Sequence, residues 1–277
     1  MYDEPTSGLD WETMRGHYHA KRMLEVAASG NHSILLVGPP KAGKAVMARS
    51  LTTILPECPF IAPQPHTDSF SAAIEQARGG ILFLQDLEQW DDPSLALLRE
   101  TVARQPGLFL LVATARYCPC GNYSDAVQDC TCFTVAVEAH QERLRETVYA
   151  CFAIEAQIPS VNRDLASRRP DEPSRAVRER VAAARLIQCQ HNGEARLNSA
   201  LSLPEVEERS PMDSPAQKLL AAAHAQLPLT PEQGLFLLQV ARTVADLASG
   251  YRTVPCVQAN HLAEAICYRP RWTRGTK

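Results

Sequence analysis

The feature that most constrains the fold is residues 33–56, where an apolar run leads through a glycine- and proline-rich loop into an amphipathic helix pattern. The apolar residues 34–37 predict a short buried strand, and the spacing of apolar residues after position 44 predicts a helix. The loop between them fits G-x-x-x-x-G-K from Gly38 to Lys44. In such loops the backbone N–H groups at the helix start hold phosphates, and the lysine reaches the β- and γ-phosphates. The sequence therefore predicts a P-loop α/β fold that binds a nucleotide.

Two residues of this loop depart from the usual phosphate-binding pattern. The last position, where a Ser or Thr hydroxyl normally holds Mg²⁺, is Ala45. Lys41 stands where related loops usually carry glycine, and a side chain there strains a backbone that approaches phosphates closely. We expect nucleotide contacts with weakened Mg²⁺ binding, and a solvated Gly-Lys turn is the alternative interpretation. The predicted nucleotide-binding residues of this segment are Gly38, Pro39, Pro40, Lys41, Ala42, Gly43, Lys44, Ala45 and Val46.

Length and composition describe a soluble globular protein. A chain of 277 residues is long enough for about two domains, each with its own core. The net charge of −3 gives no overall basic field, so binding to DNA would need a local basic patch. No apolar run approaches the ~20 residues of a membrane span, and the N-terminal residues are acidic and lack a signal-peptide core. We therefore expect a cytoplasmic protein without membrane contact.

Four of the nine cysteines are clustered in the sequence. In a chain without a secretion signal, cysteines point to reduced thiols or metal ligands rather than to a disulfide framework. Cys118, Cys120, Cys130 and Cys132 form two C-x-C pairs separated by a short segment. Four thiols presented by two tight turns suit a tetrahedral structural Zn²⁺. The sequence thus predicts a zinc site, with free thiols or a disulfide as the alternatives.

Several segments together resemble one known family. The phosphate loop is similar to G-P-P-G-A-G-K-T. The apolar run 79–84 is similar to the Walker B strand G-G-V-L-F-L-D-E-L. The cysteine cluster is similar to N-P-C-P-C-G followed by C-T-C. On these segments, in this order, the chain resembles the magnesium-chelatase-like AAA+ ATPases, specifically the ComM (YifB) group. The resemblance covers roughly residues 10–271. The segments that carry it are 10–28, 31–40, 59–66, 79–84, 118–132, 240–247 and 261–269.

The resemblance implies a P-loop AAA+ core with a parallel sheet flanked by helices, and a C-terminal α-helical lid. We expect the core over residues 1–165, including the Cys-rich loop 118–132, and the lid over residues 166–277. Helix patterns at 174–190, 214–226, 231–249 and 258–268 agree with such a lid. Ser214-Pro215 and Thr230-Pro231 each offer an N-cap followed by proline at the first helical position.

The resemblance also assigns nucleotide contacts outside the loop. In that family the segment containing Met14 and Gly16 packs on the adenine. The lid helix of the family carries arginines that face the nucleotide, and at three of these positions this chain has Glu232, Phe236 and Gln239. Arg242 is the arginine that remains, and a helix-surface residue is the alternative interpretation of it.

The Walker B segment departs from the family at both of its acidic positions. The aspartate that orients Mg²⁺ is replaced by Gln85, and the glutamate that activates water is replaced by Asp86. Glutamine is a poor ligand for a hard cation. Asp86 is the candidate catalytic residue, but its side chain is one methylene shorter. Two other interpretations concern Glu88: in a shifted register it is the base while Asp86 binds Mg²⁺, or it belongs to a solvated acidic turn.

Two further family positions bear on hydrolysis. Arg116 stands where the family has a sensing asparagine, and it either compensates with its charge or is a surface arginine. Cys151 aligns with the arginine that acts on the nucleotide of a neighbouring subunit, and such an arginine can be worth ~10³ or more in rate. With Ala45, Gln85 and the lid substitutions, these changes predict that ATP hydrolysis is weak or lost.

The sequence thus favours a degenerate Mg-chelatase-like AAA+ protein that binds ATP or ADP and serves as a regulatory or structural ring subunit. Its partners are expected to be copies of itself or an intact AAA+ relative. One alternative is an active ATPase in a mixed ring with such a relative, acting on DNA. Against a DNA role, the segment between Lys44 and Ile81 is much shorter than in the family, so the pore insertions are missing. A second alternative is a nucleotide-free, zinc-stabilised interaction scaffold.

Overall fold

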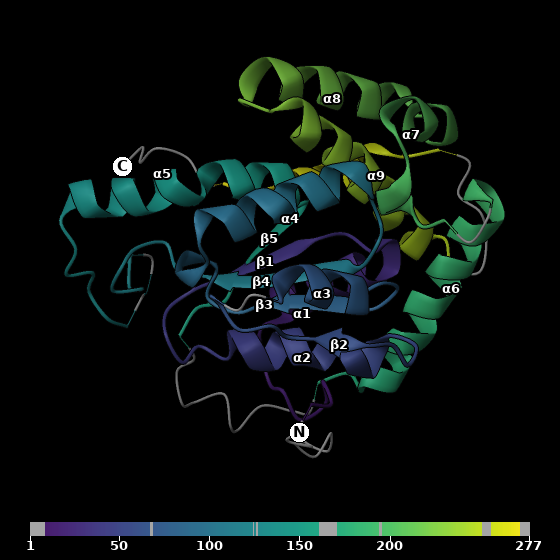
Figure 1. Ribbon diagram of the computed structural model, residues 1–277. Coiled ribbons are helices and arrows are strands. Elements are labelled where there is room, and N and C mark those ends of the chain that lie inside the picture. The colour runs from purple at the N-terminus through teal and green to yellow at the C-terminus, as the bar shows by residue number, and fades with distance from the viewer. Residues whose placement is uncertain are drawn as a thin grey trace.

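The computed structural model describes residues 9–66, 69–123, 125, 127–160, 171–193, 196–250 and 256–271. At its centre is a sheet of five parallel strands in the order β2-β3-β4-β1-β5 (Figure 1). The strands are β1 (Ile34–Val37), β2 (Phe60–Ile61), β3 (Ile81–Leu84), β4 (Leu110–Ala115) and β5 (Ile154–Gln157). This arrangement, with helices on both faces, confirms the predicted α/β fold class.

The three central strands are buried on both faces. Every residue of β1, β3 and β4 is buried. Their nearly continuous apolar sequences follow from this position, because a parallel sheet covered by helices exposes neither face to water. Strand β1 lies between β4 and β5, with Val37 in register with Ala115 and Gln157. The strands therefore end together at the edge from which the phosphate loop departs.

Two sets of helices cover the two faces of the sheet (Figure 1). Apolar residues of α1 (Tyr18–Gly30) and α2 (Lys44–Ile54) form one hydrophobic cluster with the sheet. Apolar residues of α3 (Phe70–Gln76), α4 (Asp92–Arg104) and α5 (Thr134–Cys151) form the other, together with Trp90. The core therefore consists of three layers, as is usual for parallel α/β domains.

The C-terminal part is helical, as predicted. It contains α6 (Ser174–Asn192), α7 (Leu203–Arg209), α8 (Ser214–Gln226), α9 (Pro231–Ala248) and α10 (Ala259–Tyr268). Helices α6 and α9 pack against α1, and α8, which lies at the top of Figure 1, packs against α10. Apolar residues of α6, α9 and α10 belong to the same cluster as α1 and α2. The predicted boundary at residues 165 and 166 lies outside the described residues.

Helix starts show where local sequence reasoning succeeded and where it failed. The predicted cap Thr230 is confirmed, because its hydroxyl accepts a hydrogen bond from the backbone N–H of Gln233. The predicted cap Ser214 is wrong. The cap is Asp213, whose carboxylate accepts from the backbone N–H of Ala216, and Ser214 is already helical. Both residue types suit the position, so only the backbone geometry distinguishes them. Helix α7 was not predicted.

Among the described residues, none of the helices combines the length and the apolar character needed to cross a membrane.

His32 links the turn after α1 to helix α9. Its ring is buried, with 1% exposed, and Nε2 lies 2.6 Å from Thr243 Oγ1. Burial lowers the pKa of His32 to about 3. The unfolded chain takes up a proton on this residue below about pH 6.5, whereas the folded chain does not until far lower pH. The folded protein is therefore destabilised as the pH falls from about 6.5 towards 3.

We expect the free energy of unfolding to fall by about 2 to 3 kcal/mol between about pH 6.5 and 4.5 because of His32 alone. Urea denaturation at these two pH values measures the loss. His32→Gln is the control, since its neutral amide does not titrate and its loss should be smaller by that amount. Equal losses in the two proteins would contradict this assignment.

Candidate functional site

A cavity of about 460 Å³ lies where β1, β3 and β4 end. Ligands of open parallel α/β sheets bind beyond the carboxyl ends of the strands, where neighbouring connections leave in opposite directions. Here β1 is that position, since its neighbours are β4 and β5. Three separate segments line the cavity: the phosphate loop with the start of α2, the turn after β3, and the end of β4. The lining residues are Pro40, Lys41, Ala42, Gly43, Lys44, Ala45, Val46, Gln85, Asp86, Gln89, Thr114 and Arg116.

The phosphate loop is closed on itself by its lysine. Lys44 Nζ donates hydrogen bonds to the carbonyl oxygens of Gly38 at 2.6 Å and Pro39 at 2.8 Å. Burial lowers the pKa of Lys44, and the carboxylates of Asp86 and Glu88 oppose this effect. A phosphate group offers the ammonium stronger, charge-assisted acceptors than these two carbonyls. The lysine is thus placed to exchange loop carbonyls for phosphate oxygens.

The backbone of the loop carries the strain that its sequence predicts. Lys41 has φ 63, in the left-handed region. A residue with a side chain pays roughly 1–2 kcal/mol for this conformation, whereas glycine adopts it freely. The Lys41 side chain is exposed and lines the cavity. Its ammonium group adds a second positive charge beside that of Lys44.

The turn after β3 places one carboxylate in the cavity. Asp86 has φ 49, and its backbone N–H donates to Thr114 Oγ1 at 2.8 Å. Thr114 Oγ1 in turn lies 3.4 Å from Asp86 Oδ1. Gln85, the preceding residue, lines the same cavity with an exposed amide side chain. The positions expected to coordinate Mg²⁺ therefore offer an amide and the methyl group of Ala45.

Glu88 and Arg116 form an ion pair beside this cavity. The Glu88 side chain is only 7% exposed, and its Oε1 accepts from Nε of Arg116, which is 26% exposed. The interpretation of Glu88 as part of a solvated acidic turn is wrong, because the structure buries it against this guanidinium. Arg116 lines the cavity, and its compensation by charge stays a prediction. Glu88 does not line the cavity, so the structure keeps it from the position that a general base needs.

Cys151, which replaces the arginine that acts on a neighbouring subunit in the family, and the nearby Arg143 both make their contacts inside the chain. Cys151, at the end of α5, is fully buried in the cluster with α4, and burial raises its pKa to about 12. Arg143 donates from Nη1 to the carbonyl of Glu88 at 3.0 Å and from Nη2 to that of Trp90. In this geometry Cys151 cannot present a group to a neighbouring subunit, and Arg143 stabilises the turn between β3 and α4.

Five of the predicted nucleotide-binding residues do not line the cavity: Gly38 and Pro39 at the start of the loop, and Met14, Gly16 and Arg242 outside it. Arg242 is buried in α9, where its Nε donates to Asp246 Oδ1 at 2.9 Å, so the alternative of a helix-surface residue is wrong as well. Gly16 donates its backbone N–H to Asp171 Oδ2 at 3.1 Å. Met14 packs against the apolar cluster of α1 and α2. These residues do not line the cavity beside the loop.

The lid positions Glu232, Phe236 and Gln239 face a second cavity of about 860 Å³. It is also lined by Ser33 and Phe109, which precede β1 and β4. The cavity therefore lies at the amino ends of the strands, across the sheet from the phosphate loop. This placement was not predicted, because the path of the helical part around the sheet is not a local property.

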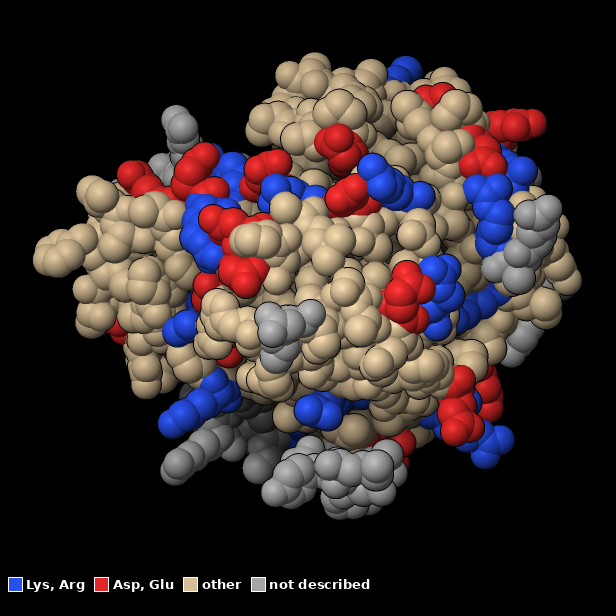
Figure 2. Space-filling view, in the orientation of Figure 1, with Lys and Arg blue, Asp and Glu red and all other residues tan. Residues whose placement is uncertain are grey.

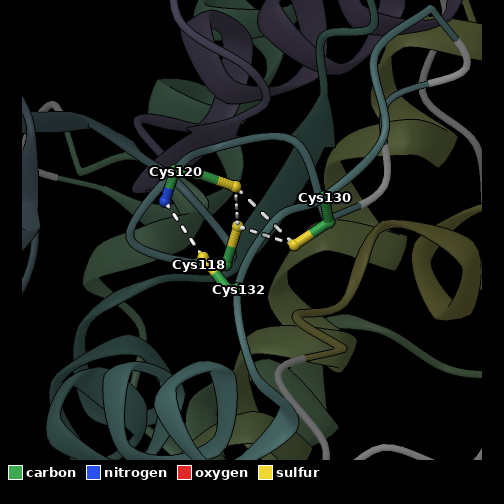
Figure 3. A group of neighbouring side chains, drawn as sticks. All are labelled: Cys118, Cys120, Cys130 and Cys132. Carbon is green, nitrogen blue, oxygen red and sulfur yellow. Dashed lines mark hydrogen bonds between the residues drawn. The ribbon is translucent and has the colours of Figure 1, made fainter.

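The four clustered cysteines converge on one point (Figure 3). Their sulfur atoms all lie within 4.8 Å of one another. Three of the Sγ–Sγ distances are 3.4, 3.6 and 3.7 Å. Tetrahedral Zn²⁺ with Zn–S bonds of about 2.3 Å requires sulfur separations of about 3.8 Å. The four thiols Cys118, Cys120, Cys130 and Cys132 thus fit a single tetrahedral metal ion.

Backbone N–H groups and burial act in opposite directions on the thiols of this cluster, and burial raises the pKa of Cys118 to about 12. Gly121 N donates to Cys118 Sγ at 3.2 Å, and Cys120 N donates to Cys132 Sγ at 3.4 Å. The backbone N–H groups of Asn122 and Thr131 lower the pKa of Cys120 to about 5. Thiolate is the form that binds metal, so the loop favours the ligand state of this cysteine.

The cysteine loop packs directly on the phosphate loop, which the sequence did not indicate. Arg116 Nη1 donates to the carbonyl of Pro119, between the first two cysteines, at 3.1 Å. A Cβ atom on Gly121 would lie 2.5 Å from Pro40 Cδ, so only glycine fits this contact. The proposed metal site and the cavity are therefore neighbours that share Arg116.

Comparison with known proteins gives consistent matches along the chain. The profile of magnesium chelatase, subunit ChlI, matches residues 10–62 and 65–165, and that of the subunit ChlI C-terminal region matches residues 171–269. The uncharacterized protein YifB of Escherichia coli is 27% identical over 94% of this chain and 60% of its own length. The competence protein ComM of Haemophilus influenzae gives the same three values. Rv2897c of Mycobacterium tuberculosis is 27% identical over 98% of this chain and 63% of its own length. The chain thus spans about 60% of the length of the curated relatives it matches.

Proposed function

The chain belongs to the magnesium chelatase subunit ChlI family, and from this premise we propose that it is a degenerate AAA+ subunit that binds ATP or ADP without efficient hydrolysis. It acts as a regulatory or structural member of a ring, with itself or an intact relative, in the cytoplasm. The core comprises residues 1–165 and the lid residues 166–277. This division is supported by the two family profiles, which end at residue 165 and begin at residue 171.

The charge of the cavity carries the nucleotide proposal. Its lining includes the cations Lys41, Lys44 and Arg116, against the single carboxylate of Asp86. Helix α2 begins at Lys44, so its N-terminal N–H groups add a partial positive charge at the same place. An anionic ligand of extended form, such as a nucleotide polyphosphate, matches this arrangement.

The same residues explain why hydrolysis is weak in this proposal. Phosphoryl transfer depends on Mg²⁺ and on groups that stabilise the charge of the transferred phosphate. Ala45 and Gln85 supply no good oxygen ligand for Mg²⁺, and Glu88 is held by Arg116. Cys151 is buried at the position where relatives carry the arginine that acts on the nucleotide of a neighbouring subunit. Asp86 alone remains as a candidate base.

A structural metal completes the proposal. The thiols of the cysteine loop would hold Zn²⁺, which would crosslink two turns whose cysteines form no disulfide. The geometry and the backbone N–H donors both support a thiolate site.

The surface charge on the visible face does not support DNA as a partner. On the face shown in Figure 2, Lys and Arg side chains lie interspersed with Asp and Glu, and no extended basic region is present there. Proteins that bind DNA through its phosphates present basic patches or stripes. An interaction with a protein partner in a ring is the assembly that we propose.

Titration with a fluorescent ATP analogue tests the nucleotide proposal. Lys44→Ala is expected to weaken binding about 10- to 100-fold, because a charge-assisted contact to phosphate is lost. Lys218→Ala, an exposed lysine on α8, is the matched control and should bind as the wild type does. If wild type and Lys44→Ala bind equally, or neither binds, the nucleotide proposal is wrong. The zinc-stabilised scaffold, which the closed loop and the cysteine geometry favour, would then be the better description.

A further inference from the structure

We propose that Arg116 replaces Mg²⁺ in the cavity, so that a nucleoside polyphosphate binds there without a metal ion and its terminal phosphates contact this guanidinium. This inference rests on the proposed function and specifies the ionic form of the ligand. It concerns a position at which this chain differs from the family it resembles.

The cavity provides the positive charge that a metal ion usually brings. Mg²⁺ prefers six oxygen ligands in near-ideal octahedral geometry and is usually held by carboxylates and phosphates. Among the described residues, Asp86 is the only carboxylate that lines the cavity, and it lies beside the hydroxyl of Thr114. Against it stand the three cations of Lys41, Lys44 and Arg116. Even when Glu88, which pairs with Arg116 beside the cavity, is counted with Asp86, the three cations outnumber the two carboxylates.

Arg116 is held in place from two sides. Nε pairs with the buried carboxylate of Glu88, and Nη1 donates to the carbonyl of Pro119 at 3.1 Å. Its own backbone carbonyl lies 2.8 Å from His140 Nε2 on α5. Within the part of the chain that the structure describes, Nη2 makes no hydrogen bond. A planar guanidinium fixed at two nitrogens presents its remaining donors in one direction, which suits a phosphate.

Glu88 has a role in this arrangement that does not require it to touch the ligand. Its carboxylate is nearly buried and does not line the cavity. Its second oxygen, Oε2, has no hydrogen-bond partner among the described residues. The ion pair with Arg116 is the interaction that retains this carboxylate in the interior. Glu88 is therefore a positioning residue for Arg116.

The cysteine loop supplies the other anchor. Pro119 lies between Cys118 and Cys120, and Gly121 packs against Pro40 of the phosphate loop. A closed thiol cluster fixes the Pro119 carbonyl and with it the guanidinium. Loss of the cluster should therefore weaken nucleotide binding even though no cysteine lines the cavity.

Binding of the fluorescent ATP analogue in buffer freed of divalent ions by resin, and again with millimolar Mg²⁺, tests the inference. Resin is used because a soluble chelator would also compete for metal at the cysteines. The wild type is expected to bind as tightly without Mg²⁺ as with it. Arg116→Ala should weaken metal-free binding by about 30-fold, and Arg116→Lys and Glu88→Gln by smaller factors. Arg104→Ala, which removes an exposed arginine from α4, is the matched control and should have no effect.

The double variant Ala45→Thr with Gln85→Asp keeps the inference testable if Arg116→Ala does not fold. It restores the two Mg²⁺ positions while Arg116 stays in place, and its binding should become sensitive to Mg²⁺. If wild-type binding depends on Lys44 but requires Mg²⁺, and Arg116→Ala binds normally, the inference is wrong while the proposed function stands. If the wild type binds no nucleotide in either buffer, the proposed function itself fails.

Discussion

Cys120→Ser is expected to reduce the zinc content of the purified protein from about one ion per chain to near zero. The reason is geometric and electrostatic. Cys120 Sγ lies 3.4 Å from Cys118 Sγ and 3.6 Å from Cys130 Sγ, and backbone N–H groups stabilise its thiolate. A serine hydroxyl is neutral at neutral pH, and it is a poor ligand for a metal that prefers thiolates. Elemental analysis of the purified protein measures the change.

The same substitution should lower the thermal unfolding temperature, because structural zinc contributes apparent binding free energies of about 10–16 kcal/mol in small zinc domains. Cys267→Ser is the matched control, since Cys267 is an exposed cysteine on α10, away from the cluster. It should retain zinc and stability. If wild-type protein prepared in zinc-containing medium carries no bound metal, the thiols serve another purpose.

Gly38→Ala is expected to destabilise the fold by about 3 kcal/mol or more, as overpacking against rigid atoms does. A Cβ atom at Gly38 would lie 2.1 Å from the carbonyl oxygen of Ile158. That oxygen belongs to backbone at the end of β5, where Ile158 N donates to the carbonyl of Val37 at 2.8 Å. The clash cannot be relieved without separating β1 from β5. Guanidinium denaturation measures the loss.

Gly43→Ala in the same loop separates this clash from the general effect of placing alanine there. Gly43 has φ 87, and a Cβ atom would meet nothing within 4 Å. Gly43→Ala should therefore lower the free energy of unfolding by only roughly 1–2 kcal/mol, the cost of placing a side chain on a left-handed backbone. If Gly43→Ala is as destabilising as Gly38→Ala, contact with Ile158 is not what requires glycine at the start of the loop.

The two proposed sites act as one unit in this view of the molecule. The phosphate loop and the cysteine loop follow β1 and β4, which are neighbours in the sheet. Their contacts run through Arg116 and Gly121, so a change in either loop reaches the other.

The sequence alone determined most of the secondary structure and the chemistry of the loops. The strand before Gly38, the helix after Gly43 and the helices α8 and α9 were predicted because apolar periodicity, caps and turn residues act over a few positions. The convergence of the four thiols could also be predicted, since each C-x-C pair brings two of them together locally. These features depend on neighbours in the chain.

Only the tertiary structure decided which distant side chains became partners. One of the two interpretations of Glu88 placed it in a solvated turn, yet the order of strands in the sheet brings the turn after β3 beside Arg116 at the end of β4. Arg242 was expected at the nucleotide, yet the path of the helical part buries it against Asp246. Such pairings depend on which strand ends and helix faces meet, and that is set by packing of the whole chain rather than by local sequence.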